Sequence, residues 1–422
     1  MTEKVAGSDS GFAGAGTALV VYLVLLLALP QQLIVGPLGF AGSPATIWGL
    51  VCFLRWVWFQ VGRVHPIHEP RAVRWLALAF LAAVLLSYTR AMSFPMAGDE
   101  VTVADAGVLR VLSWLGVLLL AADGLRGAKD WWRVLEWVVG LCALLAALAI
   151  VQAFTGQAWV DRISIPGLIA NAPIELTDAR QGLTRPTGTA THAIEFGQVL
   201  TVGLVISAAM ALVRTSTTHR VAVMLTAAAA LLTVSRSAVL SMLVAFLVLG
   251  GTLSRRQKMV GAAMGVVVTM AAYLLQPGLL GTLTRMFTGI EGDASARSRT
   301  DSYGYAFQAF SHSPWVGKGF ATFLPKYRIL DNQWLLSAIE IGVVGVLALL
   351  LLMVATVRSG FRAKQALPTR EEQVVVHACS AAVIALCVGM LFYDGFAFPQ
   401  ATGLLFVAGG LAAASYRISR SV

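Results

Sequence analysis

Long apolar runs separated by short polar segments fill most of the chain, which is the pattern of a polytopic membrane protein. A window of about 20 residues, the length that crosses a bilayer as a helix, finds about twelve such runs. The runs cover residues 17–35, 44–62, 74–92, 106–125, 133–153, 195–213, 221–234, 236–252, 259–277, 333–357, 373–392 and 396–416. The first run lacks a small-residue cleavage site, so we expect it to be kept as a span. We predict an all-α integral membrane protein, forming a single polytopic domain over residues 1–422.

One apolar region, residues 221–251, is interrupted in its middle by Arg236, between Ser235 and Ser237. A charged side chain at such a position is costly, and basic residues flank the region on both sides, which favours a hairpin with Arg236 at its outer tip. Each arm has about fifteen residues and rises roughly 22 Å, less than the ~30 Å hydrocarbon core. We therefore expect Arg236 at the depth of the lipid phosphates. The structural alternative is an arginine that snorkels to the interface or caps carbonyls at the turn.

Charges in the loops predict the orientation of the helices. Short loops at alternate ends carry clusters of Lys and Arg, for example residues 358–370, and such clusters favour the cytoplasm. Both termini are then cytoplasmic, whereas the acidic residues Asp99 and Glu100 fall in an outer loop. A single long span over residues 221–251 would place the 358–370 cluster outside, so the loop charges support the hairpin independently.

Two predicted outer segments are too long to be simple connections: residues 155–194, and residues 278–333 before the tenth span. Loops of this length are usually functional or disordered. In the second segment Tyr303, Phe307 and Phe310 recur at helical spacing. We therefore expect this segment to be partly helical, with an amphipathic helix whose aromatic side chains cover the mouth of the bundle.

The composition excludes a soluble domain and changes how the net charge is interpreted. Hydrophobic residues make up 58% of the chain and charged residues 12%, unlike a soluble protein. A net charge of +10 would suggest nucleic acid binding in a soluble protein. Here most basic residues lie in short loops, so we expect no nucleic acid partner. All four cysteines fall inside apolar runs, which predicts packing and no disulfide framework.

The predicted outer face is rich in basic residues, most of them in the two long segments. They are Arg162, Arg180, Arg185, Arg236, Arg285, Arg297, Arg299, Lys318, Lys326 and Arg328. A basic mouth of this kind predicts an anionic ligand. The alternatives are that these side chains bind phospholipid headgroups or pair with outer carboxylates such as Asp178 and Asp301.

Several short polar motifs occur in a particular order and spacing. They are Arg185-Pro-Thr-Gly188 followed by His192 and Glu195, Thr233-Val-Ser-Arg236-Ser, Arg299 with Tyr303, His312-Ser-Pro314-Trp-Val-Gly317-Lys-Gly319-Phe, and Asp331-Asn332-Gln-Trp. On these motifs the chain resembles the O-antigen ligase and O-antigen polymerase superfamily of polytopic, GT-C-like glycosyltransferases. The resemblance covers about residues 185–345, whereas the first five spans match only in hydropathy and number.

The resemblance implies a metal-independent glycosyltransferase at the outer face of a bacterial plasma membrane, acting in cell-surface polysaccharide assembly. Its donor is a glycan on a polyprenyl diphosphate carrier, and its acceptor is a hydroxyl of a glycan, lipid or protein. The enzyme is either a polymerase or a ligase. By similarity, Arg236 and Arg299 hold the diphosphate, with Arg297 beside them. Arg185 is a further diphosphate ligand or else anchors its loop to a carboxylate. Guanidinium groups suit this role because they pair with phosphate oxygens and neutralise the leaving group.

One position departs from the pattern of the superfamily. Many members place a histidine just before the asparagine, as the activator of the acceptor hydroxyl, whereas this chain has Asp331 before Asn332. Aspartate, with a reference pKa of about 3.9, is a weak base, and nearby arginines lower its pKa further. We expect Asp331 to orient the hydroxyl and to take its proton late. His312 is the fallback base, and capping of the tenth span is the structural alternative for Asp331.

Other polar residues of the motifs are candidates for contacts to the acceptor or its sugar. His192 and Glu195 are three residues apart, so on a helix they share a face. Their spacing resembles half of a metal site, but no second His or Cys pair accompanies it, so we expect neither a metal nor a cofactor. Local packing is the alternative for both. Lys318, in a predicted turn at residues 314–319, and Asn332 are further candidates.

Two classes of function remain open. In the first, an inverting transfer, the acceptor hydroxyl attacks the anomeric carbon while the arginines stabilise the leaving diphosphate. The alternative is a transporter or flippase of an anionic lipid-linked glycan. Transporters usually carry paired broken helices and polar groups near the midplane, whereas the polar cluster here lies at one face. A noncatalytic scaffold would leave the spacing of Arg236, Arg299 and Asp331 unexplained.

Overall fold

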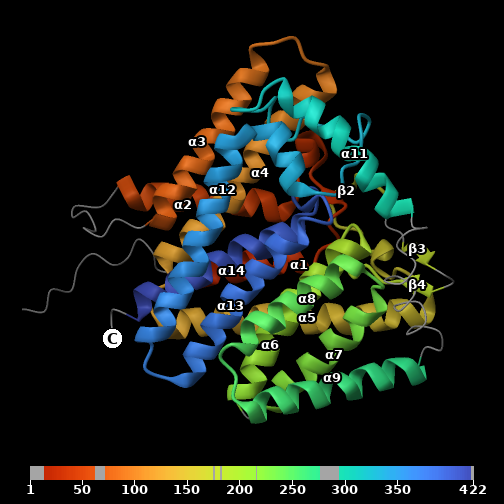
Figure 1. Ribbon diagram of the computed structural model, residues 1–422, viewed down its shortest axis with the longest axis vertical. Helices are drawn as coiled ribbons and strands as arrows, with labels where there is room; N and C mark the ends of the chain where they lie inside the picture. The colour runs from red at the N-terminus through yellow and green to blue at the C-terminus, as the bar shows by residue number, and fades with distance from the viewer. Residues whose placement is uncertain are drawn as a thin grey trace, which may run out of the picture.

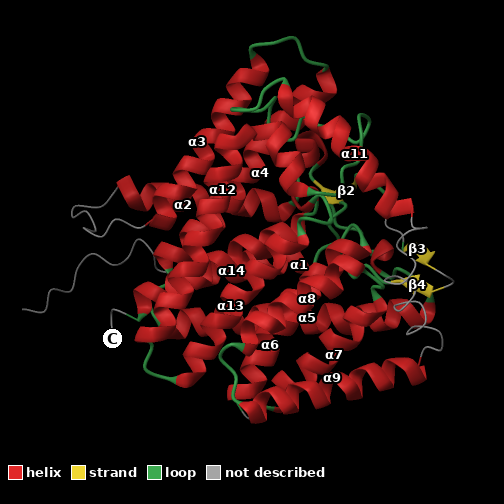
Figure 2. Ribbon diagram, in the orientation of Figure 1, coloured by secondary structure: helices red, strands yellow, loops and turns green. Residues whose placement is uncertain are grey.

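The computed structural model describes residues 14–61, 72–173, 176–180, 183–214, 216–275 and 294–419. Helices dominate these residues, and strands occur only as two short pairs in the connections (Figure 2). Among the described residues, seven helices are long and apolar enough to cross a membrane. They are α3 (Ala72–Met92), α4 (Gly98–Gly124), α5 (Ala128–Thr155), α6 (Ala193–Val213), α12 (Gln333–Ala366), α13 (Arg370–Gly389) and α14 (Pro399–Ile418). The chain is therefore a multi-pass membrane protein.

Further helices and the strands complete the described part of the chain. The helices are α1 (Ala15–Leu27), α2 (Pro44–Val61), α7 (Thr217–Leu232), α8 (Arg236–Gly250), α9 (Arg255–Leu275) and α11 (Ala294–Ser311), with short 3₁₀ turns η1 (Gly36–Ala41), η2 (Val160–Arg162) and η4 (Gly395–Ala397). Antiparallel strands pair β1 (Leu33–Ile34) with β2 (Ile169–Ala170) and β3 (Thr177–Arg180) with β4 (Leu183–Arg185). Each predicted span overlaps a helix, whereas twelve membrane crossings stay a prediction.

The length predicted for the first span is wrong. The hydrophobic pattern predicts a helix over residues 17–35, but α1 ends at Leu27 after 13 residues. Pro30 lies three residues after the helix end and lacks the backbone N–H that a further turn needs. The chain instead enters β1, which pairs with β2. The connection after α1 is thereby joined to the first long segment.

The predicted hairpin around Arg236 is present. Helix α7 has 16 residues and α8 has 15, so they rise roughly 24 and 22 Å, short of the ~30 Å hydrocarbon core. The turn between them places Val234 at a φ of 46°, a strained value for a β-branched residue. The side chain of Ser235 then caps α8 by accepting a hydrogen bond from the N–H of Ala238. We call residues 233–237 the tip.

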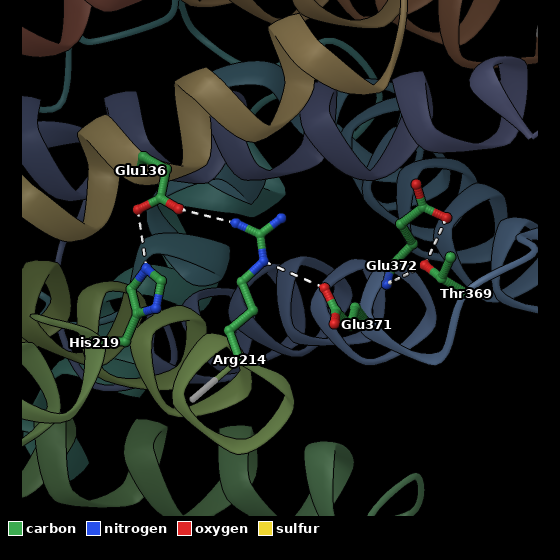
Figure 3. Close-up of polar contacts among 6 residues, drawn as sticks. All are labelled: Glu136, Arg214, His219, Thr369, Glu371 and Glu372. Carbon is green, nitrogen blue, oxygen red and sulfur yellow. Dashed lines mark hydrogen bonds and ion pairs between the residues drawn. The ribbon is translucent and has the colours of Figure 1, made fainter. Parts of the chain in front are cut away.

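Hydrogen bonds at the opposite end of the bundle show which helix ends lie together. Arg214, just after α6, is paired with Glu136 of α5 at 3.2 Å and with Glu371 of α13 at 3.3 Å (Figure 3). Arg370 donates to the carbonyl of Thr252, just after α8, at 3.2 Å. We call this the Arg214 end. Because α7 begins here and α8 returns here, the chain reverses at the tip as the hairpin requires; the side of the membrane that each end faces stays a prediction.

The core of the protein lies around α6, α13 and α14, the most deeply buried of the membrane-length helices. Helix α8 packs on α13 and α6, whereas α9, at the lower edge of Figure 1, packs mainly on α7. All four cysteines are unpaired, and three of them are buried in helix interfaces, which confirms the packing role expected for them. The tip is therefore supported by helices of the central core.

Helix α11 confirms the predicted helical spacing but corrects the face that it buries. Ser302 and Ala306 face inward, and Ala306 packs with neighbours that include Phe310. Tyr303 and Phe307, by contrast, are 53% and 71% exposed. Small residues let α11 approach the bundle closely, so its two most exposed aromatic rings do not cover the mouth.

Candidate functional site

The tip presents a helix N-terminus together with an arginine. Arg236 is the first residue of α8 and is half-buried. The hydroxyls of Ser235 and Ser237 are 3.1 Å apart beside it. The N-terminus of a helix carries partial positive charge and N–H groups that attract anions. Arg236 and α8 together therefore form a favourable position for a phosphate group.

Arg185 reaches the same tip from the first long segment. It lies at the end of β4, which contacts α5 (Figure 1). Its side chain is buried, and its Nε donates to the carbonyl of Thr233 at 2.9 Å. Thr233 is three residues before Arg236, so two arginines that are far apart in the sequence approach one turn. Arg185 thus contacts the turn that bears Arg236, while their joint role in holding a diphosphate stays a prediction.

His192 lies beside Arg185 and is held in one tautomer. Its Nδ1 accepts a hydrogen bond from the N–H of Ile194 at 3.1 Å, so the side chain caps α6. Burial and the nearby charge of Arg185 lower the pKa of His192 to about 4. At neutral pH the imidazole is uncharged, and its proton is on Nε2. His192 can therefore donate a hydrogen bond from this position but cannot accept a proton through Nδ1 without releasing the cap.

Glu195 is explained by the fold. Its side chain is fully buried, and Oε2 accepts from both the N–H and the hydroxyl of Thr191, at 2.9 and 2.8 Å. Its Oε1 accepts from the N–H of Gln400 at 2.6 Å, in the first turn of α14. Oε2 thus holds the turn before α6, and Oε1 joins α6 to α14. Within the described residues, no group of three or more His, Cys, Asp and Glu side chains is arranged to hold a metal ion.

The segment before α12 holds Asp331 in a tight turn. Asp331 has a φ of 50°, in the left-handed region. The next residue, Asn332, caps α12 by accepting from the N–H of Leu335 at 3.1 Å. Its own N–H donates to Asp394 at 2.9 Å. Capping is therefore the work of Asn332, and the alternative that Asp331 caps the tenth span is wrong.

The 314–319 motif is structural. Gly317 and Gly319 have φ values of 78° and 121°, and a Cβ on Gly317 would collide with the carbonyl of Glu340. The backbone of the motif pairs with the start of α12, where the N–H of Gly319 donates to the carbonyl of Glu340 at 3.0 Å. Helix α12 breaks its helical geometry at Gly342, with a φ of 64°, to make room for this contact. The predicted turn is confirmed, and it fixes the segment between α11 and α12 to α12 itself.

Two candidates for substrate contact, His312 and Lys318, lie in the segment between α11 and α12. Lys318 is partly buried, and its Nζ lies over the rings of Phe323 and Tyr327, at 4.8 and 4.9 Å from their centroids. Burial lowers its pKa, although the nearby Glu100 opposes this. His312 is exposed at the end of α11, with Nδ1 at 2.7 Å from the carbonyl oxygen of Gln308. In the part of the chain that the structure describes, neither side chain hydrogen-bonds to the tip, and both residues lie between α11 and α12.

Arg297 and Arg299 lie in α11. The structure describes the backbone of this helix there but not these two side chains. The helix itself is anchored by Ser302, whose hydroxyl accepts from Nε of Arg328 at 2.7 Å. Leu330, next to Asp331, packs in the same cluster as Ala306 of α11. The helix that carries both arginines is thus packed against the segment that carries Asp331, while their approach to the tip stays a prediction.

Two further residues support the candidate site, Gln152 and Asp394, and no sequence motif identifies either of them. Gln152 is a buried residue of α5 whose amide binds the loop at Gly188. A single polar residue near the end of an apolar run carries no pattern that distinguishes it. Asp394 holds the turn of Asn332 from a position 62 residues further along the chain, a partnership that spacing cannot reveal.

Comparison with known families connects these residues to a function. Residues 221–350 match the model of the family described as O-Antigen ligase. The matched segment runs from α7 through the tip and α11 into α12, and it confirms the resemblance to the O-antigen ligase and polymerase superfamily. Arg185 and His192 lie outside it. No curated protein matches the chain.

Proposed function

We propose that this membrane protein, with its O-antigen ligase segment at residues 221–350, is a metal-independent inverting glycosyltransferase of cell-surface polysaccharide assembly. It transfers a glycan from a polyprenyl diphosphate carrier to an acceptor hydroxyl at the outer face of the plasma membrane. The observation that carries the proposal is the hydrogen bond from buried Arg185 to Thr233, which brings a second guanidinium to the tip that bears Arg236. The family match does not favour a transporter or flippase.

The tip provides the chemistry that the leaving group needs. As the bond between the anomeric carbon and the diphosphate breaks, negative charge develops on the phosphate oxygens. Arg236, Arg185 and the N-terminus of α8 place positive charge at that point. Arg299, with Arg297 beside it, completes the diphosphate site from α11. The polyprenyl tail lies between the spans, since the arms of the hairpin are too short to carry Arg236 beyond the phosphate depth.

The acceptor is activated opposite the tip. Its hydroxyl oxygen attacks the anomeric carbon, and its proton passes late to the Asp331 carboxylate, with His312 as the fallback base. The turn that presents Asp331 is held by the bond from Asn332 to Asp394. His192 acts as a hydrogen-bond donor to the donor glycan or its diphosphate, because Nδ1 is engaged in the α6 cap. Inversion follows because attack and departure occur on opposite faces of the anomeric carbon.

The proposal is tested by incubating the purified protein in lipid with a polyprenyl diphosphate glycan. We expect free carrier diphosphate and a larger glycan, both lost in Arg236→Ala and in Arg299→Ala. A ladder of products identifies a polymerase, and one added block identifies a ligase. Movement of the intact donor across the bilayer without any cleavage would overturn the proposal in favour of a flippase.

A further inference from the structure

We infer that Gln152 is a positioning residue for the diphosphate site, although it contacts no reacting group. This inference rests on the proposed function. Gln152 lies near the end of α5 and is fully buried. We propose that its side-chain amide fixes the loop that carries Arg185 and thereby sets where that guanidinium meets the tip.

The amide of Gln152 makes a complete set of hydrogen bonds to two loop segments. Its Oε1 accepts from the N–H of Gly188 at 2.8 Å. Its Nε2 donates to the carbonyl of Gly188 at 3.0 Å and to the carbonyl of Ala158 at 2.7 Å. Both amide hydrogens and the amide oxygen are used, which we call the amide clamp. A buried side chain of this kind loses several bonds at once when it is replaced by an apolar one.

Gly188 is suited to be held in this way. Its φ is 61°, which favours glycine, and a Cβ here would come within 2.7 Å of the ring of Phe196. The next residue, Thr189, donates to the carbonyl of Leu27 at 2.6 Å and accepts from Nε2 of Gln400 at 2.8 Å. The loop is thereby fixed to α5, α1 and α14 within two residues. Arg185, only three residues before Gly188, enters the site from this fixed point.

Helix α5 supports the tip as well as the loop. Val234 and Leu232 form a small apolar cluster with Ile150 and Ala153 of α5, on either side of Gln152 in the sequence. One helix therefore positions both partners of the bond between Arg185 and Thr233. Catalytic arrangements lose much of their rate when a charged group moves by about 1 Å. This is the physical reason why a residue outside the site affects it.

Gln198 provides a matched control. Gln198 is also fully buried and lies on α6, the helix that follows α5. Neither its Oε1 nor its Nε2 makes a hydrogen bond to the residues that the structure describes. Methionine has nearly the same shape as glutamine and lacks the amide. We therefore compare Gln152→Met with Gln198→Met in the full-length protein in lipid. Hydrogen exchange of the backbone around Gly188 and donor kinetics are measured for each.

For Gln152→Met we expect backbone amides around Gly188 to exchange about tenfold faster or more. We also expect kcat/KM for the donor glycan to fall about tenfold or more, with the KM for the acceptor unchanged. Gln198→Met should alter neither quantity. Unchanged exchange around Gly188, or equal loss of donor kcat/KM in both variants, would overturn the inference. If the wild type itself turns over no donor, the proposed function fails, and the exchange result still decides whether the clamp holds the loop.

Discussion

The tip and the Arg214 end use arginine in different ways. Arg214 is paired with Glu136 and Glu371, and its guanidinium lies 3.8 Å from the ring centroid of Trp132. Carboxylates cancel its charge, and the result is a join between three helices (Figure 3). Arg185 instead donates through Nε to a backbone carbonyl, that of Thr233, and so holds the turn of the tip. Its charge is felt nearby, since it helps to lower the pKa of His192.

The two ends thus differ in what orients each arginine, which is carboxylates of other helices at the Arg214 end and the backbone of the turn at the tip. A carboxylate partner satisfies a guanidinium and removes the field that would attract a phosphate. A backbone carbonyl orients a guanidinium and adds no net negative charge of its own. Position in the sequence does not distinguish these two arginines. Arg185 precedes α6, and Arg214 follows the same helix.

The largest expected effect is the loss of turnover in Arg236→Ala. Removing a group that stabilises developing charge costs about 10²–10³ in kcat. Arg236→Lys should recover little, because an ammonium cannot pair with two phosphate oxygens at once. Arg214→Ala, measured in parallel by initial rates, should keep near-normal turnover per folded molecule. Equal losses at both ends would mean that the comparison between them is wrong.

A smaller loss is expected for the acceptor side. Asp331→Asn should lower kcat about 10²-fold, because an amide can orient the hydroxyl but cannot take its proton. Asn332→Ala should instead lower stability by about 1 kcal/mol through loss of the α12 cap. Rates and thermal unfolding of both variants separate the two roles. Full turnover in Asp331→Asn would remove Asp331 as the proton acceptor and direct attention to His312.

His192 should contribute an acid-dependent loss of stability. Its pKa is about 4 in the folded protein and about 6.5 when unfolded. The unfolded chain therefore binds more protons between these values, and stability falls as the pH drops from about 6.5 toward 4. The free energy of unfolding falls by on the order of 2 kcal/mol over this range, a value that allows for the partial exposure of the His192 side chain. His192→Asn keeps a capping side chain and should flatten the dependence of Tm on pH over this range; an unchanged dependence would contradict the assignment.

The smallest effect is expected at the Arg214 end. Arg214, Glu136 and Glu371 have side chains 34%, 43% and 48% exposed. Pairs as accessible as these contribute about 0–1 kcal/mol each. Glu136→Gln should therefore lower Tm by only a few degrees. A collapse of folding in this variant would show that His219, buried and 2.9 Å from Glu136, makes the join more important than its exposure indicates.

The sequence predicts those features that depend on local pattern. Hydrophobic runs located the helices of the predicted spans, and flanking charges together with the arm length predicted the hairpin, because a chain in a bilayer must satisfy both span length and loop charge. Helical spacing also predicted α11. The end of α1 was missed because Pro30 interrupts a run that remains apolar.

The site was less predictable because its contacts join distant segments. The bond from Arg185 to Thr233 spans 48 residues, and the bond from Gln400 to Glu195 spans 205. His192 and Glu195 share a helical spacing, yet one caps α6 and the other caps α14. Residue spacing shows which side chains can face the same way, whereas the partner on another helix decides what each one does.

The central claim is that the tip binds and releases a carrier diphosphate. The most direct measurement is the stoichiometry of released polyprenyl diphosphate and transferred glycan, with purified protein in lipid. We predict one carrier diphosphate released per glycan transferred, abolished in Arg236→Ala and retained in Arg214→Ala. Release that continues in Arg236→Ala, or glycan transfer without release of the carrier, would contradict this account.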